Sequence, residues 1–284
     1  MTMSPRPTPL LLVHGFWFGS WCWSEVIARV AAAGRVVQAV DLAGHGLRAR
    51  RPACLVKRPF DPDELATEVS PVSDVDLDEA GDLLVSQLRR LAQDGPVTAV
   101  AHSMGGAVLT RAVQQVPELV AQAVYLAAFM PGSGVPSDVY ARSPENADSV
   151  VTQVMRGDPG VIGALRLDLA SADDGYRRLL RAAFFDDLAP DAAEAAIGLL
   201  TPDGPLAMQL DSTRLTRDGW GSVPRTYIVC EQDRALRPAV QRRLIAEADA
   251  AFPENPTSVV TLDSSHSPFL SLPGRVAEIL AKPH

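Results

Sequence analysis

The amino-acid sequence predicts an α/β fold: a mostly parallel β-sheet flanked by helices and interrupted once by a helical insertion. Short apolar runs alternate with helical patterns in the first 130 residues and again after residue 223, the rhythm of a parallel sheet covered on both faces. The stretch between them is rich in Asp, Arg, Ala, Gly and Pro and lacks this rhythm. We therefore expect a core made of residues 1–130 and 224–284, with a cap or lid formed by residues 131–223.

The expected strands are short and apolar, and each is followed by a turn or a helical pattern. They are Pro9–Val13, Arg35–Asp41, Pro96–Ala101, Ala121–Ala128, Arg225–Cys230 and Ser258–Leu262. Expected helices are Ser24–Ala33, Leu77–Ala92, Met104–Val116, Pro238–Ala250 and a last one that begins at Pro273, with short helical patterns around Val150, Tyr176 and Ala192. Residues 47–75 contain four prolines and no clean period. A loop of this length inside a domain is expected to be partly structured or to border a site.

The composition excludes several classes of protein. With 284 residues, 47% hydrophobic, 21% charged and a net charge of −8, the chain is an ordinary globular one. No Lys/Arg-rich block suggests nucleic-acid binding, and no apolar run reaches the length of a signal peptide or membrane span. The cysteines Cys22, Cys54 and Cys230 match no zinc spacing and are expected to be buried, reduced thiols. We expect a cytoplasmic protein without metal or cofactor.

The sharpest motif is Ala101-His102-Ser103-Met104-Gly105-Gly106, between an expected strand and an expected helix. A serine on such a tight turn is the arrangement of a nucleophile elbow, which exposes the hydroxyl and offers the next amide to an oxyanion. The turn requires small residues two positions before and after the serine, and Ala101 and Gly105 meet this requirement. We expect Ser103 to be a nucleophile and the Met104 amide an oxyanion-hole donor. The alternative is a glycine-rich turn with an incidental serine.

A second oxyanion donor is expected from the loop after the first strand, where Gly15 allows close backbone approach and the Phe16 amide follows it. Aromatic residues crowd this loop: Phe16, Trp17, Phe18, Trp21 and Trp23. Gly15, Phe16 and Trp17 are the expected substrate contacts, whereas Trp21 and Trp23 are expected to fill the core.

A serine hydroxyl needs a base to take its proton. The candidates are His14, His45, His102, His266 and His284. His14 and His102 are expected to be structural, His102 because it adjoins Ser103 and should point away from the site. His45 lies in a loop after the second strand, and His284 is the last residue. His266 follows the last expected strand, at the sheet edge where ligands gather, and is the base by elimination and position.

The acid that orients the base should lie between the serine and the histidine in sequence. Glu231, Asp233 and Asp263 compete for this role. Asp233 follows the strand Arg225–Cys230 by a short turn that lets its carboxylate reach His266, and it is the preferred candidate. The alternative for each is a solvated loop carboxylate.

The order Ser103, Asp233, His266, with an insertion after the fourth strand, resembles the α/β-hydrolase fold. More narrowly, residues 14–23, HGFWFGSWCW, resemble the HG-x-x-x-G-x-W-x-W entry of the methylesterase and hydroxynitrile lyase branch. The resemblance covers residues 9–130 and 225–281 and is weak across the insertion.

The resemblance implies that these three residues form the catalytic triad, that the Phe16 and Met104 amides form the oxyanion hole, and that the insertion caps the site. Ala101 replaces the usual glycine of the elbow, and the segment 47–75 is longer than in the family. Lyase activity in this branch relies on a lysine after the catalytic histidine and a threonine in the first loop. Ser267 and Gly15 occupy those positions here, so cyanohydrin cleavage is not expected.

We expect a serine hydrolase that cleaves a carboxylic ester of a small apolar or aromatic molecule through an acyl-enzyme. One alternative is a tailoring enzyme that uses the same three residues for acyl transfer, carbon–carbon hydrolysis or a lyase step on a bulky metabolite. Another is a receptor that binds a ligand without turnover. In the insertion, Met155 and Trp220 are further candidate substrate contacts. No nucleic-acid or membrane partner is expected, and a homodimer is an open alternative to a monomer.

Overall fold

A six-stranded parallel sheet forms the centre of the computed structural model, which describes residues 8–281. The strand order is β2-β1-β3-β4-β8-β9, and every neighbouring pair is parallel. The strands are β1 (Leu10–Val13), β2 (Val37–Val40), β3 (Val97–His102), β4 (Val120–Leu126), β8 (Arg225–Cys230) and β9 (Ser258–Leu262). The predicted α/β fold is confirmed. Lys282 and His284 lie outside the described residues.

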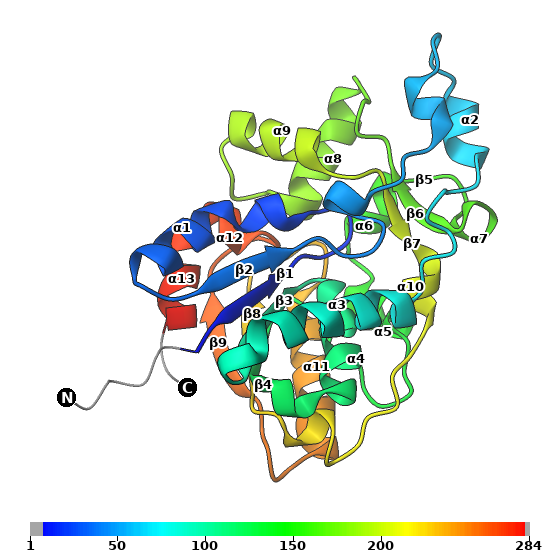
Figure 1. Ribbon diagram of the computed structural model, residues 1–284. Helices are drawn as coiled ribbons and strands as arrows, with labels where there is room; N and C mark the ends of the chain where they lie inside the picture. Colours follow the sequence, from blue (N-terminus) through cyan, green and yellow to red (C-terminus); the bar gives the residue numbers. More distant parts are fainter. Residues whose placement is uncertain (1–7, 282–284) are drawn as a thin grey trace.

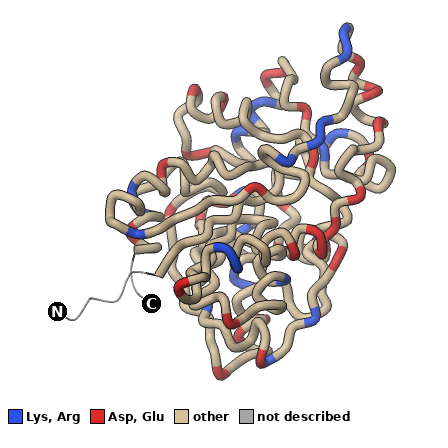
Figure 2. Tube along the Cα trace, viewed as in Figure 1, with Lys and Arg blue, Asp and Glu red and all other residues tan. Residues whose placement is uncertain are grey.

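Helices cover both faces of the sheet, which is why β1 and β3 are buried along their whole length. Figure 1 shows α1 and α13 on one side and α3, α4 and α11 on the other. These helices, with the short α12, are α1 (Ser24–Ala32), α3 (Leu77–Leu91), α4 (Gly105–Gln115), α11 (Pro238–Ala251), α12 (Pro268–Ser271) and α13 (Pro273–Ala281). Among residues 8–281, no helix has the length and apolar character needed to cross a membrane. Figure 2 shows acidic and basic residues interspersed over the described chain.

The edge strand β2 is shorter than predicted because Asp41 leaves it to hold two loops. Its carboxylate accepts hydrogen bonds from the backbone amides of Ser20, at 2.6 Å, and Leu47, at 3.0 Å. The helix α12 was not predicted, since it is a single turn that begins at Pro268.

In the insertion, residues 131–223, the part up to α10 (Leu206–Leu210) lies over one end of the sheet, and the chain after α10 runs back along the side to the other end, where β8 begins (Figure 1). The insertion is not purely helical. Its helices are α5 (Ser137–Ala141), α6 (Val151–Val154), α7 (Pro159–Ile162), α8 (Asp174–Phe184), α9 (Pro190–Leu199) and α10 (Leu206–Leu210). It also contains an antiparallel sheet of β5 (Met155–Arg156), β6 (Ala164–Leu167) and β7 (Asp203–Pro205). These strands carry no alternating pattern, since β7 is Asp-Gly-Pro.

The segment 47–75 is partly structured, as expected, and packs against the insertion. It contains the helix α2 (Pro62–Thr67) and a short 3-10 helix, Ala53–Val56. Arg166 of β6 donates to the carbonyls of Leu65, at 2.9 Å, and Glu68, at 2.7 Å. None of its residues lines the main cavity described below, so the hypothesis that it borders the site is wrong.

The sheet topology places the candidate site. From β1 the chain first adds β2 on one side and later returns to add β3 on the other. The strand order therefore reverses between β1 and β3, and the loops that leave these two strands diverge and open a crevice. Those loops carry Gly15, Phe16 and Ser103.

Candidate active site

Ser103 sits on the turn between β3 and α4 in a strained conformation. Its φ is +51°, in the left-handed region that residues with a side chain rarely adopt. A Cβ atom on Gly105 would lie 2.2 Å from the carbonyl oxygen of His14, and one on Gly15 would lie 2.5 Å from the Ser103 Cβ. Both glycines are therefore required for the first loop and the elbow to approach each other. Ala101 is fully buried in β3, so its methyl group is accommodated.

His266 and Asp233 form a buried pair beside this turn. The Nδ1 atom of His266 lies 2.7 Å from Oδ2 of Asp233. Oδ1 of Asp233 accepts the backbone amides of Ala235, at 2.8 Å, and Leu236, at 3.0 Å, and Oδ2 also accepts from Gln241 at 3.1 Å. The Asp233 side chain is inaccessible to solvent and that of His266 nearly so. This carboxylate is held by four donors, and it fixes the orientation of the imidazole.

The competing carboxylates point elsewhere. Glu231 pairs with Arg242 at the surface, and Asp263 accepts from Gln232 at 2.9 Å while remaining exposed. Of the three candidates, Asp233 alone contacts His266 in the described structure.

Three other histidines are buried and serve structure. His14 accepts the backbone amide of Leu42 on Nε2, at 3.1 Å, and donates from Nδ1 to the carbonyl of Gly15. Burial lowers the pKa of His14 to about 4 and that of His45 to about 3. Burial also lowers the pKa of His102 well below its usual value. The Nε2 of His102 hydrogen-bonds the backbone carbonyl of His266 at 2.8 Å, so it holds the loop that carries His266.

The aromatic residues of the first loop fall into two groups. Phe16 and Trp17 line the main cavity, and Trp17 reaches into the insertion to donate from Nε1 to the carbonyl of Leu165 at 2.9 Å. Trp23 is fully buried against Phe269, and Trp21 stacks on the buried Phe18.

The backbone amides of Phe16 and Met104, on the first loop and the elbow, have no protein acceptor among the described residues. Phe16 is 4% exposed and Met104 is 2% exposed, and among residues 8–281 the structure gives neither amide a hydrogen bond. Buried N–H groups are nearly always paired, so an unpaired couple beside a strained serine is the arrangement expected of an oxyanion hole before substrate binds.

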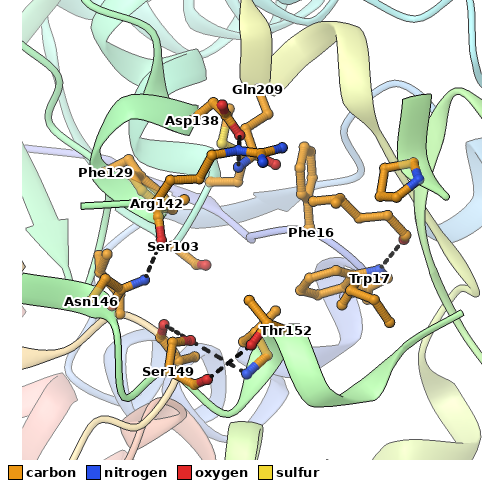
Figure 3. Close-up of a pocket in the computed structure, with 18 of the residues that line it drawn as sticks. Phe16, Trp17, Ser103, Phe129, Asp138, Arg142, Asn146, Ser149, Thr152 and Gln209 are labelled. Atoms are coloured by element: carbon orange, nitrogen blue, oxygen red, sulfur yellow. Dashed lines mark hydrogen bonds and ion pairs between the residues drawn. The ribbon is translucent and has the colours of Figure 1, made fainter. Parts of the chain in front are cut away.

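A cavity of about 440 Å³ lies between the sheet and the insertion (Figure 3). Ser103, Met104, His266, Phe16 and Trp17 contribute to its wall from the sheet side. Apolar residues of the insertion and of the loop after β8 complete it: Val151, Met155, Leu165, Phe184 and Leu236. Ser103 and His266 thus share one cavity wall, whereas Asp233 lies behind His266.

Two expected substrate contacts are corrected by the structure. Trp220 is buried away from the cavity, where its Nε1 donates to the hydroxyl of Tyr125 at 2.7 Å and its ring packs on Phe252. Gly15 does not line the cavity either. Its position is set by the close approach to Ser103. Met155 does line the cavity.

Residues of the insertion that sequence reasoning missed hold the loops of the site. Oδ1 of Asn146 accepts the backbone amide of Arg237 at 3.0 Å, and the hydroxyl of Ser149 donates to the carbonyl of Ala235 at 2.8 Å. Asp187 accepts the backbone amide of Ser265 at 2.9 Å, and also its hydroxyl. The insertion therefore contacts the loops of both Asp233 and His266. No sequence period marks these residues.

Comparison with known proteins agrees with this geometry. Residues 10–279 match the alpha/beta hydrolase family. The chain belongs to that family. Methylesterase 1 of Arabidopsis thaliana is 27% identical over 286 residues, which cover 99% of this chain and 98% of the relative. Methyl jasmonate esterase 1 of Vitis vinifera is 27% identical over 278 residues, or 95% and 94% of the two chains. A solved pyrethroid hydrolase, PytH, is 26% identical with a TM-score of 0.73 over 96% of each chain.

These findings confirm the alpha/beta hydrolase fold and the resemblance to the methylesterase branch. Because both plant relatives are named as esterases, they also confirm the prediction of a carboxylic ester hydrolase at the level of the reaction class.

Proposed function

We propose that this alpha/beta hydrolase cleaves a carboxylic ester through an acyl-enzyme formed on Ser103. The observation that carries the proposal is the His266–Asp233 pair, 2.7 Å apart and buried, whose imidazole opens onto the same cavity as the strained serine. A serine in that setting has the base and the orienting carboxylate that nucleophilic attack requires.

The proposed reaction assigns one role to each of these groups. Nδ1–H of His266 donates to Asp233, which leaves Nε2 unprotonated and able to take the Ser103 proton as the hydroxyl attacks the ester carbonyl. The amides of Phe16 and Met104 stabilise the oxyanion. His266 then protonates the departing alcohol, and water repeats the cycle on the acyl-serine.

The cavity supports a small and largely apolar substrate. About 440 Å³ is the size of a small-molecule site, and its walls carry Phe16, Trp17, Leu165 and Phe184. The insertion closes the cavity opposite the sheet, and we propose that residues 131–223 act as its cap. The similar plant proteins are named for methyl esters, and a methyl ester of an apolar or aromatic acid is the substrate that we propose.

The deciding experiment compares wild-type protein with Ser103→Ala on a panel of methyl and aryl esters. We expect Ser103→Ala to lower kcat/KM by at least about 10⁴-fold, and mass spectrometry to find the acyl group on Ser103 of the wild type. Ser86→Ala, on the far helix α3, is the matched control. Full activity of Ser103→Ala, or an acyl group on another residue, contradicts the proposal.

The cytoplasmic location stays a prediction, and the homodimer stays an alternative to the monomer. The three cysteines are free and buried, which agrees with the expected reduced thiols. Fractionation of the native host and light scattering of the purified protein test the two predictions.

A further inference from the structure

One polar atom of a side chain in the cavity wall, Oε1 of Gln209, has no hydrogen-bond partner. Gln209, on α10, is 7% exposed, and its Nε2 donates to Oδ1 of Asp138, on α5, at 3.4 Å. Only the NH₂ group of an amide can donate to a carboxylate, and this contact fixes which end of the amide faces Asp138. The other end, Oε1, is shielded from solvent and has no hydrogen-bond partner. An unmatched buried acceptor destabilises the protein and calls for an explanation.

The other polar side chains of the insertion that line the cavity are already used. Asn146 donates to the carbonyl of Ala141 and accepts from Arg237. Ser149 is bonded to Ala235, and the hydroxyl of Thr152 donates to the carbonyl of Ser149 at 3.3 Å. These groups hold the insertion together, whereas Oε1 of Gln209 serves no internal contact.

Arg142 completes a cluster with Gln209 and Asp138. Its Nε donates to Oδ1 of Asp138 at 2.8 Å, and among the described residues its two terminal nitrogens have no hydrogen bond to another side chain. Figure 3 shows the three side chains together on one side of the cavity, apart from Trp17. Asp138 and Arg142 are the carboxylate and the guanidinium in the cavity wall, so their charges cancel.

We infer that Gln209, Asp138 and Arg142 form a subsite for a hydroxyl group carried by the substrate. The inference rests on the proposed ester hydrolysis at Ser103. A hydroxyl donates one hydrogen bond, which Oε1 of Gln209 accepts, and accepts others, which the free N–H groups of Arg142 supply. A neutral cluster favours this neutral group over an ammonium or a carboxylate. The Arg142 side chain is 73% exposed, and the proposal includes a movement of this side chain that gives the substrate hydroxyl access to Oε1.

The subsite makes a specificity prediction. An ester with an apolar or aromatic body and a distal hydroxyl should be hydrolysed faster than the same ester without it. A site that leaves polar groups unpaired discriminates strongly against the analogue that lacks the matching group. Because this cluster is partly open at Arg142, we expect about a 10- to 100-fold difference in kcat/KM.

The experiment uses the methyl esters of ortho-, meta- and para-hydroxyphenylpropanoic acid against methyl phenylpropanoate. Wild-type protein should prefer one of the hydroxylated esters by the stated factor. Gln209→Met, which keeps the length of the side chain, should abolish the preference for the hydroxylated ester over the plain ester. Arg142→Gln, at an exposed position that does not threaten folding, should weaken the preference. Thr152→Val, in the same cavity wall, should change both classes of ester by the same factor.

The outcomes separate this inference from the proposed function. Equal hydrolysis of all four esters by the wild type, abolished by Ser103→Ala, overturns the subsite and leaves the esterase standing. A preference that survives both Gln209→Met and Arg142→Gln also overturns it. Hydrolysis that persists in Ser103→Ala overturns the proposed function itself.

Discussion

Two carboxylates, Asp233 after strand β8 and Asp203 in the insertion, are both buried, but they have different hydrogen-bond partners. Asp203 accepts from Nε and Nη2 of Arg166, at 2.7 and 2.8 Å, and from the hydroxyl of Ser70 at 2.6 Å. Asp233 accepts two backbone amides and the Gln241 side chain as well as His266. Both are nearly inaccessible to solvent.

Because of this difference in partners, Asp203 has a structural role, whereas Asp233 can take part in the reaction. Arginine stays protonated and grips a carboxylate through two parallel N–H groups, which fixes geometry. Here the Arg166 pair joins β6, β7 and the segment 47–75. An imidazole can accept a proton on one ring nitrogen while it donates from the other, so the same kind of buried carboxylate beside His266 can orient a base. The partner, a guanidinium or an imidazole, decides what the buried carboxylate does.

The largest effect is expected when the Asp233 carboxylate is replaced by an amide. In Asp233→Asn the side-chain oxygen can still accept the amides of Ala235 and Leu236, so the fold should persist. The new NH₂ group faces Nδ1 of His266 and forces the proton onto Nε2, where it blocks the base. We expect kcat to fall by about 10⁴-fold in a protein that still folds, with a lower Tm because the new NH₂ group also faces the Nε2 donor of Gln241. Asp263→Asn, an exposed neighbour, is the control, and near-wild-type turnover by Asp233→Asn would exclude the assigned role.

Removing Arg166 from its pair with Asp203 should lower the stability of the protein and not its turnover rate. Arg166→Met leaves the Asp203 carboxylate buried without its main partner, and we expect unfolding to become easier by about 3–5 kcal/mol. The double variant Arg166→Met/Asp203→Leu should recover most of that loss, because an apolar pair of similar volume often replaces a buried ion pair. Urea titrations measure both. A single variant as stable as the wild type would show that the pair does not hold the insertion.

The stability of the protein at low pH tests a third kind of buried group, the neutral histidine His14. Burial lowers the pKa of His14 to about 4, while an unfolded histidine titrates near 6.5. Between these values the unfolded chain binds a proton that the folded chain does not, so stability should fall as pH falls from about 6.5 to about 4. The slope of unfolding free energy against pH should be shallower in His14→Gln. An unchanged slope would mean that His14 is not buried as a neutral side chain.

The smallest expected effect comes from the contact between the insertion and the His266 loop. Asp187→Ala removes the acceptor for the amide and hydroxyl of Ser265, and we expect kcat/KM to fall about fivefold. Asp186→Ala, next to it and paired with Arg234, is the matched control. If Asp186→Ala lowers kcat/KM as much as Asp187→Ala does, the effect comes from surface charge and not from this contact.

The sheet and its helices could be predicted because their signals are local. The predicted bounds of β8 and β9, Arg225–Cys230 and Ser258–Leu262, match the structure, since both are short β-rich runs enclosed by turns. The Ser103 elbow and the His266 loop were predictable for a related reason: parallel strands end at one edge, and the motifs follow the strands.

The contacts of the insertion with the site could not be predicted, because they join segments that are distant in sequence. Residues of the insertion such as Asn146 and Asp187 act through hydrogen bonds to loops 78 to 91 residues away. An isolated polar side chain in an Ala- and Asp-rich stretch belongs to no periodic pattern. Trp220 failed as a prediction because an aromatic residue near a site and one in the core look alike in sequence. Its burial against Tyr125 is decided by tertiary packing.

The bonds from Asn146, Ser149 and the backbone amide of Val150 to residues 234–237 mean that the insertion is not a detachable module. A chimaera that borrows this region from another esterase, to import its substrate range, must carry the loop after β8 with it. Without that loop, the transplanted insertion would lack the hydrogen bonds that hold residues 234–237. The Asp233 carboxylate, although unchanged, would then no longer be oriented toward His266.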